Sequence, residues 1–188
     1  MPSKILFSNY QENGQDYISP EGFENLVEDL NYSMDQIEPI VLSWLFGCSK
    51  MGFITNSEWK NAFKTLNSNS KESVNTAVET AKASLSSQPT VFKQFYLWTF
   101  LFAKDTNSKS IPSDIAASLF SVIFDKNHTH IHNFINYICL PDTVQALNKD
   151  QWTSLYDFSL QINPDFSNYD FEASWPVIFD EFVAYSTK

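Results

Sequence analysis

The sequence contains few glycines, cysteines and basic residues, and each shortage argues against a class of protein. Four glycines in 188 residues argue against a β sandwich and against a doubly wound nucleotide-binding fold. The two cysteines, Cys48 and Cys139, do not suggest a disulfide framework. Both lie among apolar neighbours, so we expect reduced thiols in the core and a protein located in the cytoplasm and nucleus.

The shortage of positive charge narrows the choice of partners. Twelve basic residues stand against 22 acidic ones, which gives a formal net charge of −10. Binding to nucleic acid or to anionic membranes depends on clustered lysine and arginine, so we expect neither and favour a basic protein partner. The start of the chain is too polar for a signal peptide, and no apolar run approaches the length of a membrane span.

Apolar residues are abundant and follow the period of a helix. Hydrophobic residues make up 43% of the chain and aromatic residues 16%, enough to bury a full core. Because they recur at spacings of three and four, we predict an all-α fold. Four predicted helix starts carry capping signals: Ser19-Pro20, Ser33 with Gln36, Thr55 with Glu58, and Asn148. The predicted helices cover about residues 20–30, 34–48, 55–66, 71–85, 90–102, 112–123, 131–138, 149–162 and 175–185.

Two joints between the first helices resemble the loops of calcium-binding EF-hands. With Ile54 as the central hydrophobic residue of one loop, Gly52 occupies the sharp turn and Glu58 the final ligand position. The first, third and fifth ligand positions carry no carboxylate and hold Gly47, Ser49 and Met51. An earlier loop centred on Ile18 has Gly22 where the final glutamate belongs. We therefore predict two degenerate EF-hand-like units that keep the packing of the helices and bind no calcium.

Three alternating histidines are the other candidate for chemistry. His128, His130 and His132 would place a pair on one side of an extended segment, but only Asp125 lies nearby to complete a metal site. We expect a solvated turn here and no metal. The sequence has no nucleophile turn and no glycine-rich phosphate loop, so we expect no catalytic residue and no cofactor.

The C-terminal run from Asp150 to Lys188 combines many acidic residues with apolar and aromatic residues at helical spacing. It holds seven acidic residues and one cation, the terminal Lys188. Apolar residues recur at helical spacing at Trp175, Ile178, Phe182 and Tyr185. Asp180 and Glu181 fall between them and therefore face another way. Carboxylates held by packed aromatic residues lose less entropy on pairing with lysine or arginine than free ones do.

The same run carries a resemblance to a known family. Trp175-Pro-Val-Ile-Phe-Asp-Glu-Phe-Val183, Ser167-Asn-Tyr-Asp170 and the earlier Gly22-Phe-Glu-Asn-Leu-Val-Glu-Asp-Leu30 resemble the potentiating-neddylation domain of the defective-in-cullin-neddylation family. The resemblance extends from about Tyr17 to Tyr185. Residues 1–16 mix polar residues with one short apolar patch, so we expect a partly ordered segment there. The resemblance implies the domain over 17–188, with an EF-hand-like half to about residue 87 and a C-terminal half from about 88. Many members also carry an N-terminal ubiquitin-binding helical domain, which we expect to be absent from this sequence.

What the resemblance implies is a non-catalytic, scaffold-type ligase component that promotes neddylation of cullins. Members of the family bind basic residues of the cullin's C-terminal winged-helix subdomain. By motif position, the resemblance assigns this cullin binding to Asp150, Ser174 and Asp180. An apolar pocket would hold the N-acetylated methionine end of the modifier-conjugating enzyme. By motif position it is lined by Phe23, Leu26, Ile40, Leu42, Met51, Ile54, Phe102, Leu119 and Val122. We expect a monomer.

Two other functions remain open on the residues alone. A calcium-responsive EF-hand-like adaptor would need ligands that the early loop positions lack. An enzyme would need a metal at the histidines 128, 130 and 132.

Overall fold

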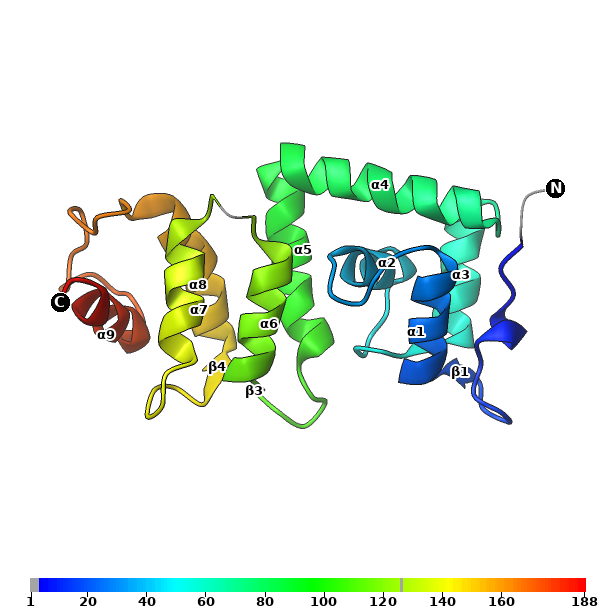
Figure 1. Cartoon of the computed structure of the whole chain (residues 1–188), viewed down its shortest axis with the longest axis horizontal. Coiled ribbons are helices and arrows are strands. Elements are labelled where there is room, and N and C mark those ends of the chain that lie inside the picture. The colour runs from blue at the N-terminus through cyan, green and yellow to red at the C-terminus, as the bar shows by residue number, and fades with distance from the viewer. Residues whose placement is uncertain (1–3, 126) are drawn as a thin grey trace. The chain divides into compact units, whose positions relative to one another are not determined.

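The computed structural model describes residues 4–125 and 127–188, and these confirm the all-α class. The described residues form nine α-helices (Figure 1): α1 Pro20–Asp29, α2 Glu38–Phe46, α3 Asn56–Leu66, α4 Lys71–Ser87, α5 Pro89–Ala103, α6 Ser113–Ile123, α7 Thr129–Ile138, α8 Lys149–Gln161 and α9 Val177–Ser186. Four short strands pair antiparallel as β1 Tyr17–Ile18 with β2 Ile54–Thr55, and β3 Ser110–Pro112 with β4 Ala146–Asn148. Among the described residues, no helix is long and apolar enough to cross a lipid bilayer.

Three of the four predicted helix starts are correct. Ser19 is the N-cap of α1 with Pro20 in the first position, and full capping boxes begin α3 at Thr55 and α8 at Asn148. The start at Ser33 is wrong, because α2 begins only at Glu38. A helix starting there would bury Pro39 in its second turn, where proline lacks an N–H and clashes with the preceding turn; in α2 Pro39 instead lies in the first turn.

The last helix also begins later than predicted. Pro176 is the N-cap of α9, so Trp175 lies in the loop before it and not on the helical stripe. Ile178 and Phe182 are buried, whereas Tyr185 is 45% exposed. The packed face of α9 is therefore shorter than the sequence pattern indicated.

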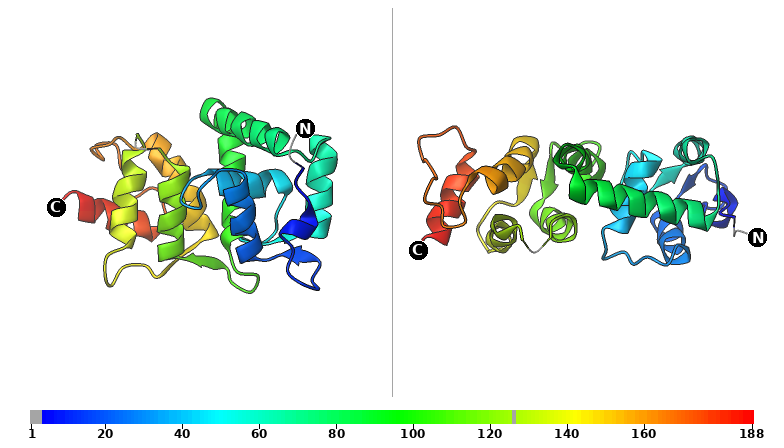
Figure 2. Two further views of the ribbon diagram at one scale, coloured as in Figure 1. Left: turned by 45° about the vertical axis from the view of Figure 1, so that its right-hand side comes forward. Right: turned by 90° about the horizontal axis from the view of Figure 1, so that it is seen from above.

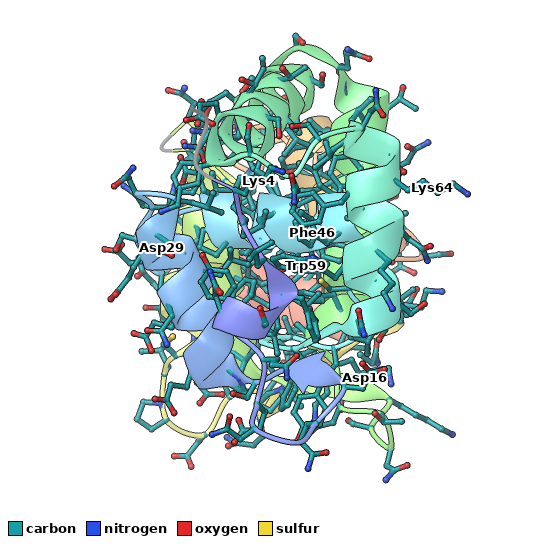
Figure 3. All side chains as sticks on the ribbon, turned by 90° about the vertical axis from the view of Figure 1, so that its right-hand side faces the viewer. Lys4, Asp16, Asp29, Phe46, Trp59 and Lys64 are labelled. Atoms are coloured by element: carbon teal, nitrogen blue, oxygen red, sulfur yellow. The ribbon has the colours of Figure 1, made fainter. Side chains whose placement is uncertain are left out.

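The chain divides into two compact units, one ending at Ala103 and one beginning at Lys104. Helix α5 thus belongs to the first unit, whereas the sequence-based joint lay near residue 87. An aromatic cluster fills part of the first unit: the rings of Phe46 and Trp59 lie 5.7 Å apart and those of Trp59 and Phe63 lie 4.8 Å apart. Figure 3 shows Phe46 and Trp59 inside this unit, with Asp29 and Lys64 at its margins.

The two expected loop centres meet in the first unit. Ile18 and Ile54 face each other across the β1–β2 pair, and both are fully buried. Glu58 closes the second loop, because its carboxylate accepts hydrogen bonds from the Ser49 N–H at 2.8 Å and the Thr55 N–H at 2.7 Å. The EF-hand-like description stays a prediction. Within the described ranges, no group of three or more His, Cys, Asp or Glu side chains is placed to hold a metal ion.

The second unit consists of α6 to α9 with the β3–β4 pair. Helix α7 contacts α6, α8 and α9, and Figures 1 and 2 show α6 and α7 side by side. Its core is aromatic: the fully buried rings include Phe120, Phe134, Trp152, Phe158, Phe179 and Phe182. This core supports the loop between α8 and α9.

The N-terminal segment packs on the first unit from residue 4 onward; residues 1–3 lie outside the described residues. The Ile5 side chain is buried, and its N–H donates to the Asn69 carbonyl at 2.8 Å. The buried Tyr10 donates its hydroxyl to Asp29 Oδ2 at 2.6 Å. This bond is the main cause that holds the pKa of Asp29 below its usual value, with a smaller contribution from Lys71.

We expect Tyr10→Phe to lower the free energy of unfolding by about 1 kcal/mol at neutral pH. The value is modest for a bond to a charged group because the Asp29 side chain is 51% exposed. A carboxyl whose folded-state pKa is lowered stabilises above its usual pKa and loses this contribution as the pH falls through the folded value. The difference between the two proteins should therefore vanish in acid. Denaturant unfolding at several pH values measures it.

Tyr17→Phe is the matched control, because the Tyr17 hydroxyl has no hydrogen bond to the described residues and its ring packs on Phe53. This variant should unfold like the unmodified chain. An equal loss in both variants, or a loss for Tyr10→Phe that persists in acid, would contradict the role of the Tyr10–Asp29 bond.

Candidate functional site

The loop between α8 and α9, residues 162–176, is fixed by side chains that bond its backbone. The Asn168 amide bridges the loop entry, since its Oδ1 accepts from the Asn163 N–H at 2.7 Å and its Nδ2 donates to the Gln161 carbonyl at 2.8 Å. His130 of α7 lies 2.9 Å from the Ile162 carbonyl and 3.0 Å from the Asn163 carbonyl through Nε2. Both partners are acceptors, so Nε2 carries the proton and donates to them.

Phe166 anchors the middle of this loop. Its φ of 60° lies in the left-handed region, which is unfavourable for a bulky residue. The ring compensates by packing, with centroids 4.8 Å from His130, 6.4 Å from Phe158 and 5.7 Å from Phe182. The loop conformation is therefore held by the core of the second unit.

Tyr169 connects the loop to the first turn of α9. Its hydroxyl donates to Asp180 Oδ1 at 2.5 Å, and its ring packs on Phe158 and Phe171. Burial, and then this hydrogen bond, raise the pKa of the Tyr169 phenol well above its ordinary value. Asp180 is half-buried and lies in the first turn of α9, where the helix dipole favours a negative charge.

A cavity of about 440 Å³ opens beside this loop. It is lined by Gln161, Ile162, Asn168, Asp170, Ala173, Ser174 and Trp175. Ser174 is exposed at this cavity, directly before the half-buried Trp175. The predicted Ser174 and Asp180 thus lie at the loop and at the helix that the loop leads into.

Asp150 lies at the other end of α8. It is exposed in the first turn of this helix, after the Asn148 capping box. Gln161, which lines the cavity, ends the same helix, about 16 Å away along its axis. Asp150 and the cavity at Ser174 therefore lie toward opposite ends of α8. The three predicted residues are exposed or half-buried, which suits a docking surface, and a protein–protein interface commonly buries about 800 Å² on each side.

The nine residues of the predicted apolar pocket are distributed over both units. Phe23, Leu26, Ile40, Leu42, Met51, Ile54 and Phe102 belong to the first unit, and Leu119 and Val122 belong to α6 of the second. Six are buried, Ile40 and Val122 are half-buried, and Met51 is 41% exposed. The Met51 N–H donates to the Phe102 carbonyl at 3.2 Å, so these two lie together. None of the nine lines the cavity at Ser174.

The expected solvated turn is confirmed for His128, which is half-buried before α7, and is wrong for His130 and His132. His128 is the N-cap of α7, and His130 and His132 lie within the helix; Lys126, in the predicted turn, lies outside the described residues. His128 Nδ1 is 2.9 Å from Asp125 Oδ1. His130 is buried because it supplies the donor for the two carbonyls after α8. Its spacing of four from the buried Phe134 was the sequence signal for this role.

The expectation for the cysteines is half correct. Cys48 is buried, and burial raises the pKa of its thiol to about 12, so it is protonated and unreactive. Cys139 is exposed, because it is the C-cap of α7 and lies beyond the packed face of that helix.

Comparison with known proteins finds one matching family model and several similar proteins. Residues 73–185 match a family model described as "Cullin binding", a range that includes Asp150, Ser174 and Asp180. The chain is 31% identical over 181 residues to DCN1-like protein 5 of Homo sapiens and of Mus musculus, covering 96% of this chain and 76% of each relative. It is 30% identical over 166 residues to DCN1-like protein 4 of Drosophila melanogaster, covering 88% of this chain and 66% of the relative.

Proposed function

Because the chain belongs to the cullin-binding family, together with the DCN1-like proteins, we propose that it binds a cullin and promotes its neddylation as a monomeric scaffold without catalytic residues. The observation that carries this proposal is the family match itself. The matched residues 73–185 include α8, α9 up to residue 185 and the loop between them, with all three residues predicted to bind cullin. The proposal includes no step that depends on calcium or on another metal ion.

The cullin's C-terminal winged-helix subdomain is the proposed partner of Asp150, Ser174 and Asp180. From Asp150 to Thr187 the chain carries seven carboxylates and no basic residue, so this surface attracts lysine and arginine side chains. The small, exposed Ser174 lets a partner backbone approach the cavity closely. The charges of Asp150 and Asp180 then set the orientation of the partner.

The N-terminus of the modifier-conjugating enzyme is the second proposed partner. Acetylation removes the charge of its methionine end, and an uncharged methionine suits apolar surroundings that would exclude an ammonium group. The nine residues of the predicted apolar pocket are all hydrophobic. In the first unit, the accessible members are Met51 and Ile40, so we propose that the peptide contacts these two first.

The activity then follows from proximity alone. The reactive thioester belongs to the conjugating enzyme and the acceptor lysine to the cullin. Holding both raises their effective concentration and restricts their orientation. No residue of this chain needs to contact the reacting atoms.

We expect the full chain to speed cullin modification about tenfold or more in a purified reaction, through the gain in effective concentration. Most of this stimulation should be lost with an unacetylated conjugating enzyme. The measurement is the initial rate of cullin modification with and without the chain, for both forms of the enzyme.

Excess calcium and a calcium chelator provide the control in that reaction, because a calcium-responsive adaptor would differ between them and the scaffold would not. A chain that binds cullin and leaves the rate unchanged would contradict the scaffold role. Equal stimulation with both forms of the enzyme would contradict the acetyl-methionine pocket alone.

We also propose the cytoplasm and nucleus as its location. Cys48 and Cys139 are both free, and the exposed Cys139 is of a kind that stays reduced in these compartments. Fluorescence microscopy of the tagged full chain tests this placement.

A further inference from the structure

We propose that Tyr169 is a positioning residue of the cullin-binding surface, and that it orders the Asp180 carboxylate before a lysine or arginine of the partner arrives. This role rests on the proposed function. Tyr169 donates to Oδ1 of Asp180 at 2.5 Å. Oδ2 has no hydrogen bond or ion pair with the described residues, so it is available to a cation.

The Tyr169 hydroxyl is itself held in place. Its ring lies 5.8 Å from Phe158, which is fully buried, and 5.0 Å from Phe171, centroid to centroid. Its backbone N–H donates to the Phe166 carbonyl at 2.9 Å. Because Phe166 is packed between His130, Phe158 and Phe182, the phenol is attached to a fixed part of the loop.

Two effects of the hydroxyl oppose each other. The hydrogen bond withdraws some negative charge from Asp180, which weakens its attraction for a cation. It also restricts the rotation of the carboxylate, and each side chain that need not be immobilised on binding improves affinity roughly two- to tenfold. The ordering effect wins, because the bond occupies one oxygen and leaves the other to the partner.

Tyr137 of α7 offers a matched control, because it also bonds a carboxylate of α9. Its hydroxyl donates to Glu181 Oε2 at 3.2 Å, and burial raises its pKa to about 12. Its ring packs on Phe134 and Phe182 in the same core. Tyr137→Phe therefore removes the same atom and the same type of bond from α9, but at a carboxylate outside the predicted cullin-binding set.

Calorimetric titration of the full chain with a purified cullin C-terminal winged-helix subdomain tests the role. Tyr169→Phe should weaken binding roughly two- to tenfold, and Tyr137→Phe should not change it. The double variant Tyr169→Phe with Asp180→Asn should bind no more weakly than Asp180→Asn alone, because Tyr169 acts through the charged carboxylate. A merely structural role would instead give losses that add.

Thermal unfolding of each variant shows whether the fold is retained, and phenylalanine keeps the ring contacts. Unchanged or tighter binding by Tyr169→Phe overturns the positioning role, as do additive losses in the double variant. If Tyr169→Phe proves unstable, the additivity measured with Tyr169→Trp in place of phenylalanine decides the matter in the same way. Absence of binding by the unmodified chain overturns the proposed function itself, and this role with it.

Discussion

Asp180→Lys should abolish binding to the cullin winged-helix subdomain while the chain remains folded. At a protein surface, two opposite charges about 4 Å apart attract by roughly 4 kcal/mol, and reversing one turns that attraction into repulsion. We therefore expect a loss of roughly 100-fold or more in affinity. A pull-down or calorimetric titration measures it.

The fold should tolerate this change. Asp180 is half-buried and bonds Tyr169 alone among the described residues, and a lysine in the first turn of a helix costs about 0.3–1 kcal/mol against the dipole. Asp114→Lys is the control, because Asp114 is an exposed carboxylate in the first turn of α6 and its reversal changes the net charge equally. A folded Asp180→Lys protein that binds cullin undiminished would sink the assignment.

Asp150→Lys tests the second predicted carboxylate in the same titration. Asp150 is exposed in the first turn of α8, so its reversal acts on the partner's charge without disturbing the core. We expect binding to be abolished here as well. Retained binding in this variant alone would confine the docking surface to the loop and α9.

Phe158→Ala should destabilise the second unit by about 3–5 kcal/mol, the range for removing a large buried aromatic ring. Phe158 is fully buried, and its ring lies within 6.0 Å of His130, Trp175 and Phe179. Its removal leaves a cavity beneath both the loop and α9. Hydrogen exchange of the α8 and α9 amides measures the second unit by itself.

The control for this variant is Phe171→Ala, since Phe171 is 56% exposed and its loss should change stability by about 0.5 kcal/mol or less. Phe158→Leu keeps most of the volume and should fall between the two. Protection of α9 that is equal in Phe158→Ala and in the unmodified chain would show that the loop and helix do not depend on this ring.

The helices were predictable because apolar spacing specified them locally, and three starts, those of α1, α3 and α8, also carried a correct capping signal. The capping box of Thr55 with Glu58 was confirmed, whereas the similar pair Ser33 with Gln36 was not a helix start. The sequence of the second pair is equally suitable, but Pro39 decides where that helix can begin. The capping signal at Ser33 therefore did not start a helix, because Pro39 is compatible only with the first turn of α2.

The site was less predictable, because the contacts that support it join loop residues to residues of other helices. No regular spacing in the sequence marks such contacts. Asp150, Ser174 and Asp180 were named from a motif, and their role stays a prediction. The bond from Tyr169 to Asp180 spans a loop whose course depends on Phe166 and His130. His130 was misjudged because alternation along the chain says nothing about two carbonyls at the end of another helix.

The closure of the loop by Glu58 has a consequence for how the first unit responds to its surroundings. The Glu58 carboxylate accepts hydrogen bonds from Ser49 and Thr55. Because it is covalently part of the chain, its local concentration at the loop is fixed. An ion would occupy such a loop only when its free concentration rose high enough. The first unit should therefore keep one shape through transient calcium signals, as a constitutive part of the protein and not as a sensor.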